Sequence, residues 1–365
     1  MRSVIAKLAA TVAVAILAAA PSYAQERVVN VYNWSDYIDS SILEDFTKET
    51  GIKVVYDTFD SNETLETKLL AGGTGYDVVV PTVSFMQRQI AAGVYQKLDK
   101  SKLPNLKNMW DVVMKGVATF DPGNEYSVDY MWGTTGIGYN VDKVKAALGT
   151  DEKPNWDALF DPAKAEKLKD CGIYMLDSPT DVIPSVLAYL GLDPNSKKQA
   201  DLDKAQEVLL KVRPFVRKFH SSEYISALAN GDICIALGYS GDMFQARDRA
   251  AEAKAGVTID YSVPSQGAQI FFDVFGIPKD APHVEEAHEF INYMMKPEVA
   301  AKASNFVFYA NGNKASQEFL DKEVIGDTAI YPTPEVMAKL FTVPPLDPKT
   351  QRLVTRIWTK VVTGQ

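Results

Sequence analysis

Short apolar segments alternate with segments of helical pattern along the first part of the chain. The pattern predicts strands at Val28–Tyr32, Lys53–Asp57 and Asp77–Val80, and helices at Ser40–Thr50 and Asn62–Ala71. Gly51 directly follows the first of these helices, which is typical of a helix end. Strands that alternate with helices form parallel β-α units, so the sequence predicts an α/β fold.

The alternation continues through the rest of the chain. Further strands are predicted at Ile137–Tyr139, Ile173–Leu176, Ile233–Tyr239 and Ile270–Ile277. Further helices are predicted at Asp201–Arg213, Tyr224–Asn230, Met243–Ala255, Val284–Met295 and Glu298–Asn305. Because the sequence has no long polar linker, we expect any two lobes to be joined by short extended crossings.

Two segments are candidates for such crossings. The first is Met131–Gly136, where Gly133 and Gly136 would permit unusual backbone angles. The second is Ser262–Ala268. We therefore expect one lobe of residues 25–134 and 262–310, and a second of residues 135–261 and 311–365. A cleft between two lobes is a favoured place for a ligand.

The amino terminus has the pattern of a cleavable secretory signal peptide. Two cations, Arg2 and Lys7, precede the apolar run Leu8–Ala20, and small residues stand before a cut that we place after Ala24. The alternative is a membrane anchor, but the run falls short of the roughly 20 residues that a spanning helix needs. Residues 1–24 are therefore predicted to be removed on export to the periplasm.

Charge and composition narrow the class of function. Removal of Arg2 and Lys7 would take the formal net charge from -9 to -11, which opposes binding to nucleic acid. The sequence has no P-loop, no Gly-x-Ser-x-Gly and no His-Glu-x-x-His motif. His283 and His288, two of only three histidines, are expected at the surface. These observations argue against the commonest enzyme mechanisms.

The two cysteines leave two alternatives open. In an oxidising compartment Cys171 and Cys234 could form a disulfide, or both could be buried free thiols. No Cys-x-x-Cys motif is present, which argues against zinc binding and redox catalysis.

Carboxylates stand beside aromatic residues where predicted strands end. The three motifs are Trp34-Ser35-Asp36-Tyr37, Tyr239-Ser240-Gly241-Asp242-Met243-Phe244 and Phe271-Phe272-Asp273. Aromatic faces attract ammonium groups and carboxylates accept their hydrogen bonds, so the motifs suit an organic cation. The alternative is that each motif is an ordinary strand end, with Asp36 and Asp242 as caps of the helices that follow.

Several segments resemble a known family along essentially the whole chain after the signal peptide. They include Val31-Tyr32-Asn33-Trp34-Ser35-Asp36-Tyr37-Ile38, Asp60-Ser61-Asn62-Glu63, Met131-Trp132-Gly133-Thr134-Thr135-Gly136, Phe219-His220-Ser221-Ser222, Phe271-Phe272-Asp273-Val274-Phe275 and Val307-Phe308-Tyr309-Ala310-Asn311. These segments resemble the polyamine-binding proteins of bacterial ABC importers, and the putrescine-binding branch is the most similar.

The resemblance implies a two-lobed periplasmic binding protein of type II, in which each lobe is a sheet flanked by helices. Such a protein closes around a linear di- or polyamine and delivers it to an inner-membrane ABC permease. It implies no enzymatic activity, no cofactor and no metal, and we expect a monomer.

The resemblance also implies the ligand-binding residues. Trp34, Phe271 and Tyr309 would surround the methylene groups, Ser35 and Asp36 would hold one ammonium, and Asp242 and Asp273 the other end. The remaining positions are Tyr37, Thr82, Asp181 and Tyr239. Resemblance to the family further favours the Cys171–Cys234 disulfide.

Three positions depart from the putrescine-binding pattern. Tyr239 stands where tryptophan is expected, Thr82 where serine is expected, and Asp181 where glutamate is expected.

Three alternatives to a putrescine-binding transport protein stay open. They are a spermidine or mixed-polyamine binder, a binding protein that reports to a signalling receptor, and a periplasmic enzyme that acts on amines or peptides.

Overall fold

The computed structural model describes residues 26–364, so the predicted signal peptide at residues 1–24 lies outside the described residues. The strands are β1 (Val28–Trp34), β2 (Lys53–Phe59), β3 (Val78–Val79), β4 (Val128–Asn140), β5 (Ile173–Met175), β6 (Val216–Phe219), β7 (Ile235–Tyr239), β8 (Ile259–Ser262), β9 (Ala268–Phe275), β10 (Ala310–Asn311) and β11 (Leu340–Phe341). Every strand predicted from the sequence overlaps one of these.

The longer helices include all of those predicted from the sequence except Tyr224–Asn230, which corresponds to the shorter α10. They are α1 (Ser40–Thr50), α2 (Asn62–Ala71), α3 (Val83–Ala91), α5 (Val141–Leu148), α8 (Pro179–Tyr189), α9 (Gln199–Val212), α11 (Ser240–Glu252), α12 (Val284–Met294), α13 (Pro297–Val307) and α16 (Pro348–Thr363). The shorter ones are α4 (Asp111–Val117), α6 (Asp157–Phe160), α7 (Pro162–Leu168), α10 (Tyr224–Ala229), α14 (Lys322–Ile325) and α15 (Pro334–Met337). The 3-10 turns are η1 (Lys100–Lys102), η2 (Pro104–Asn108), η3 (Arg213–Phe215) and η4 (Lys314–Phe319).

The first lobe is built on a parallel sheet of order β2-β1-β3, as the alternation predicted. Its helices begin and end with local signals that are visible in the sequence. Asp39 caps α1 by accepting a hydrogen bond from the backbone N–H of Ser41, and Gly51 ends the helix in the left-handed conformation. The cap of α1 is therefore Asp39, and the alternative role of Asp36 as that cap is wrong.

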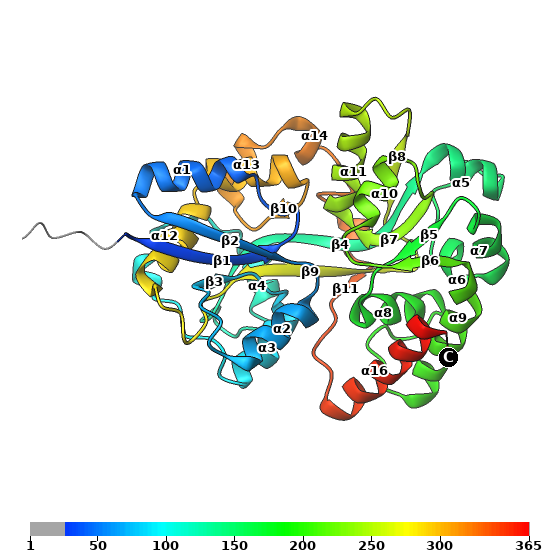
Figure 1. Cartoon of the computed structure of the whole chain (residues 1–365), viewed down its shortest axis with the longest axis horizontal. Helices are drawn as coiled ribbons and strands as arrows, with labels where there is room; N and C mark the ends of the chain where they lie inside the picture. Colours follow the sequence, from blue (N-terminus) through cyan, green and yellow to red (C-terminus); the bar gives the residue numbers. More distant parts are fainter. Residues whose placement is uncertain (1–25, 365) are drawn as a thin grey trace, which may run out of the picture.

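A single strand, β4, runs through both lobes (Figure 1). Residues Val128–Thr134 pair with β9, and Thr135–Asn140 pair with β7 and β8, all antiparallel. The predicted crossing at Met131–Gly136 is thus the middle of a continuous strand. The chain returns between the end of β8 at Ser262 and the start of β9 at Ala268, where the second crossing was expected.

Gly133 and Gly136 of β4 are required for a different reason from the one expected. Gly133 and Gly136 are not among the residues with positive φ, so the expectation of unusual backbone angles is wrong. They are needed because other groups lie close. A Cβ on Gly136 would be 2.4 Å from the hydroxyl of Tyr261, and one on Gly133 would be 2.9 Å from the ring of Tyr309.

The second lobe contains the parallel strands β7-β5-β6, with helices packed around them (Figure 1). Cys171 and Cys234 form a disulfide that closes a 63-residue separation, next to the starts of β5 and β7. α16 packs against α8 and α9, and η4 packs against α13. Within residues 26–364 no helix is both long enough and apolar enough to cross a bilayer.

We predict that the Cys171→Ala/Cys234→Ala variant loses about 4 kcal/mol of free energy of unfolding, because the disulfide restricts a long loop in the unfolded chain. Urea denaturation checks the loss. The folded variant should keep the pocket described below, because neither cysteine lines it. An unchanged free energy of unfolding would contradict the prediction.

Candidate functional site

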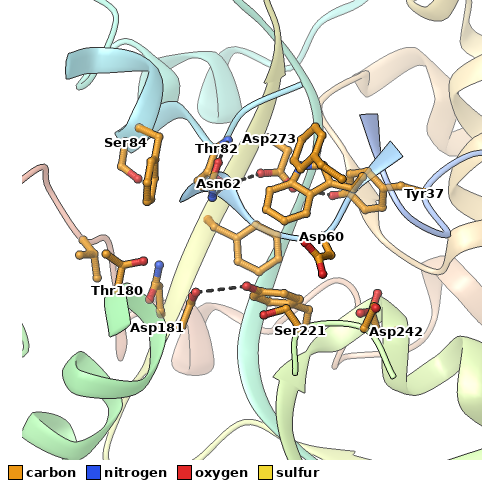
Figure 2. A pocket seen from close by; sticks show the side chains of 18 of the residues that line it. Tyr37, Asp60, Asn62, Thr82, Ser84, Thr180, Asp181, Ser221, Asp242 and Asp273 are labelled. Carbon is orange, nitrogen blue, oxygen red and sulfur yellow. Dashed lines mark hydrogen bonds between the residues drawn. The ribbon is translucent and has the colours of Figure 1, made fainter. Parts of the chain in front are cut away.

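One pocket brings together all but one of the site residues predicted from the sequence. It is lined by Trp34, Ser35, Tyr37, Thr82, Asp181, Tyr239, Asp242, Phe271, Asp273 and Tyr309 (Figure 2). These residues come from β1, α8, β7, α11, β9 and the loops beside them, so both lobes contribute. Segments separated by more than 200 residues in the sequence therefore form one wall.

Asp242 lies in the first turn of α11 and is buried. Its Oδ2 accepts a hydrogen bond from the Tyr224 hydroxyl, and its Oδ1 accepts one of 2.7 Å from the Tyr309 hydroxyl. Burial raises the pKa of Asp242 to about 6, although both hydrogen bonds act to lower it. The N-cap of α11 is Tyr239, so the alternative role of Asp242 as the cap of this helix is wrong.

Asp273 lies on β9 and is held in the same manner by residues of the first lobe. The Thr82 hydroxyl donates a hydrogen bond of 2.7 Å to one oxygen, and the Tyr37 hydroxyl donates one of 2.8 Å to the other. Burial raises the pKa of Asp273 to about 7, and the charges of Asp181 and Asp242 contribute to that increase.

Asp181 is the third buried carboxylate of the pocket. It accepts hydrogen bonds from Ser178 at 2.6 Å, Tyr239 at 3.1 Å and Thr135 at 3.3 Å. Burial raises its pKa, and these three hydroxyls oppose the shift. All three carboxylates are thus fixed by neutral hydroxyl groups.

Aromatic rings fill the space between the carboxylates. Ring centroids are 6.4 Å apart for Trp34 and Tyr239, 5.4 Å for Tyr239 and Phe271, and 6.3 Å for Phe271 and Tyr309. Tyr37 packs edge-on against Tyr309 with the centroids 5.0 Å apart. The rings therefore form a connected aromatic surface.

Asp36 is the predicted site residue that does not line the pocket. It is exposed, has a positive φ of 55°, and one of its oxygens accepts a hydrogen bond of 2.7 Å from Arg249 of α11. Gln245 of α11 also donates to the backbone carbonyl of Asp36. Asp36 therefore joins the first lobe to α11 from outside the pocket.

Several polar residues of the pocket were not predicted from the sequence. They are Asp60, Asn62, Ser84, Arg88, Thr180, Ser221, Ser222 and Gln269, some of which are labelled in Figure 2. Asp60-Ser61-Asn62 and Ser221-Ser222 were among the segments that resembled the family, so that signal was available. Asn62 accepts a hydrogen bond from the backbone N–H of Thr82 and donates to its hydroxyl, which orients Thr82 toward Asp273.

A second missed part is Val343–Leu346, which precedes α16 and forms one wall of the pocket. Nothing in its sequence indicated a site, because a run of valine, prolines and leucine has no polar chemistry.

The pocket has a strong excess of acidic groups. Among the described residues that line it, Arg88 is the one arginine or lysine. Its guanidinium forms two hydrogen bonds, of 2.6 and 2.8 Å, with Glu66, so its charge is already balanced. Asp181, Asp242 and Asp273 consequently have no cationic partner in the part of the chain described, and the pocket suits a cationic ligand.

The histidines and cysteines of the described residues lie outside this pocket. No histidine or cysteine is among its lining residues, and residues 26–364 contain no group of three or more side chains placed to hold a metal ion. His288, expected at the surface, is in fact 2% exposed, and its Nε2 accepts a hydrogen bond from the backbone N–H of Asp99. Through this hydrogen bond His288 joins α12 to the segment before η1, and it does not line the pocket.

Comparison with known proteins agrees with this geometry. Residues 41–333 match the family model of the bacterial extracellular solute-binding protein. The chain is 56% identical over 344 residues to a putrescine-binding periplasmic protein of Pseudomonas aeruginosa, covering 94% of each chain. It is 54% identical over 344 residues to a putrescine-binding periplasmic protein of Escherichia coli, covering 94% of this chain and 93% of the relative.

A solved structure supports the same assignment. The spermidine/putrescine ABC transporter substrate-binding protein of Streptococcus pneumoniae superposes with a TM-score of 0.75 at 31% identity, covering 93% of this chain and 99% of that one. The two-lobed α/β fold of type II periplasmic binding proteins, predicted from the sequence, is thereby confirmed. The chain belongs to the bacterial extracellular solute-binding protein family.

Proposed function

We propose that this protein is the substrate-binding component of a bacterial polyamine importer, which binds putrescine in the periplasm and delivers it to an inner-membrane permease. The observation that carries the proposal is the set of three buried carboxylates that are held by hydroxyls and lack a cationic partner. The relatives described above, two of which are named as putrescine-binding, support the choice of ligand.

One ammonium group of the ligand binds at Asp242. Asp36 is close enough to Asp242 for its charge to raise the Asp242 pKa, so the neighbouring Ser35 lies at the same end of the pocket. Asp36 itself is engaged by Arg249, and its contribution is to hold the lobes together. The second ammonium binds at Asp273, with Asp181 nearby.

The methylene groups lie between the rings of Trp34, Phe271, Tyr239 and Tyr309. Aromatic faces stabilise both the alkyl chain and the adjacent ammonium groups. A monoamine would leave one buried carboxylate without a partner, and an amino acid would place its own carboxylate against Asp242 or Asp273. Both are therefore rejected.

Closure of the two lobes completes the site. We propose lobes of residues 25–134 with 262–310 and of residues 135–261 with 311–365, although the packing of η4 against α13 associates residues 314–319 with the first lobe. The protein acts as a monomer, so that both lobes are free to contact the permease.

Calorimetric titration of protein that has been denatured and refolded to remove any bound ligand tests the function. We expect one-to-one binding of putrescine, weaker binding of cadaverine and spermidine, and none of butylamine or arginine. Tighter binding of spermidine would make spermidine the preferred ligand, and the protein would still be a polyamine-binding protein. Recovery of a chemically altered amine after incubation would instead establish an enzyme.

The Asp242→Asn variant should bind putrescine at least about 30-fold more weakly than the wild type, because loss of the charged partner of a buried ammonium costs about 2–5 kcal/mol. Titration calorimetry measures the affinity. The matched control is Asp248→Asn, which removes the same charge from an exposed position on the same helix. Equal putrescine affinities of the two variants would show that Asp242 does not bind the ligand.

Putrescine affinity should fall as pH decreases from 8 to 5. The pKa values of Asp242 and Asp273 in the ligand-free protein are raised to about 6 and about 7, so both carboxylates take up protons in this range. The amines of putrescine remain charged, because alkyl ammonium groups have a pKa of about 10. Binding must then displace protons, and we expect a loss of at least about tenfold.

Calorimetry in buffers of different ionisation enthalpy checks the mechanism. Proton release on binding should be measurable near pH 6 and absent at pH 8.5. An affinity that does not change between pH 5 and 8 would show that the carboxylates are ionised in the empty pocket.

A further inference from the structure

The last helix, α16, differs in charge from the rest of the molecule. The chain has 47 acidic and 38 basic residues, yet Pro348–Thr363 contains four cations and no acidic residue. The cations are Lys349, Arg352, Arg356 and Lys360, and all four are exposed.

These cations form one stripe. Their spacing of three, four and four residues places them within about 80° of the helix circumference and along about 16 Å of its axis. The opposite face of α16 is buried through Val354, Ile357, Trp358 and Val361, and the Trp358 indole donates a hydrogen bond of 2.8 Å to Asp177. The stripe therefore has a fixed orientation.

The stripe has no internal partner. None of the four cations has a carboxylate within 4 Å among residues 26–364, whereas many other surface lysines do, such as Lys211 with Glu207 and Lys302 with Asp45. Four like charges on one helix face repel one another and destabilise the helix slightly. The stability of the fold therefore gives no reason for the stripe.

The position of α16 connects it with the ligand pocket. Val343–Leu346 forms part of the pocket wall, and α16 begins two residues later at Pro348. α16 also packs on α8, whose Thr180 and Asp181 line the same pocket, and it lies along the lower side of the second lobe in Figure 1. A protein bound to α16 would thus lie next to a segment that contacts the ligand.

We infer that the basic face of α16 is a docking surface for an acidic surface of the permease that receives the ligand. The inference rests on the proposed function. Charge complementarity argues for an acidic partner. A protein is favoured over an anionic membrane, because the net charge of the chain is negative and α16 exposes no large apolar side chain that would enter a bilayer.

Spheroplasts of a strain that lacks this gene provide the test. Purified protein is added back, and uptake of labelled putrescine is measured against the concentration of added protein. Reversal of two charges, Arg352→Glu/Arg356→Glu, should raise the half-saturating concentration about tenfold, since charges at the edge of an interface govern encounter. The putrescine affinity and the thermal midpoint of the variant should equal those of the wild type.

Two variants separate docking from other effects. Lys107→Glu/Lys279→Glu makes the same change in net charge at exposed positions outside α16 and should leave uptake unchanged. Arg352→Lys/Arg356→Lys keeps the charge and should retain most of the activity. The difference between the wild type and the reversed variant should shrink at high salt, because salt screens exposed charges.

Three results would overturn the inference. If the reversed variant supports uptake at the wild-type concentration, α16 is not a docking surface. If the wild type sediments with phosphatidylglycerol vesicles and the reversed variant does not, the occupant is the membrane. If the wild type binds putrescine but supports no uptake, the proposed delivery function fails and the inference fails with it.

Discussion

Buried carboxylates without a cationic partner are the constraint on which the rest of the site depends. A charge removed from water is strongly unfavourable unless it is paired and hydrogen-bonded. Here the hydrogen bonds come from tyrosine, threonine and serine hydroxyls, which fix the oxygens but supply no charge. In the function proposed above the ligand supplies the missing charge, and much of its binding energy would then come from completing pairs that the fold leaves incomplete.

The backbone is shaped so that these hydroxyls reach their carboxylates. The ring of Tyr309 lies against Gly133 of β4 and Gly241 of α11, and a Cβ on Gly241 would be 2.2 Å from that ring. Neither glycine has a positive φ, so both are required for space. Tyr309 can therefore donate to Asp242 only because two separate elements lack side chains at this point.

The two departures at Tyr239 and Asp181 are physically linked. The Tyr239 hydroxyl donates a hydrogen bond of 3.1 Å to Asp181. An indole at position 239 has no hydroxyl, and a glutamate at position 181 would extend one methylene further. Tyr239 and Asp181 thus fit each other. The phenol hydroxyl donates to an Asp181 oxygen, which the longer side chain of a glutamate would place elsewhere.

The sequence predicted local structure and site chemistry better than it predicted contacts between distant segments. Gly51 and the strand–helix alternation act locally, so the ends of α1 and α2 and the parallel sheet of the first lobe were correct. The antiparallel pairing of β4 depends on partners more than 90 residues away, and it has no local signature. The contact between Asp36 and Arg249 was not predicted for the same reason, since the two residues are 213 positions apart in the sequence.

Protonation explains how the empty pocket tolerates its acidic excess. With Asp36 balanced by Arg249 and Arg88 by Glu66, the charge of Asp181, Asp242 and Asp273 has no neutralising side chain among the described residues. The pKa values of about 6 and about 7 mean that protons partly neutralise Asp242 and Asp273 near neutral pH. A lysine side chain that neutralised these carboxylates would compete with the ligand at every pH. A bound proton, in contrast, leaves when an ammonium group binds. Hydroxyl donors therefore permit a site that is stable when empty and still fully charged toward a diamine.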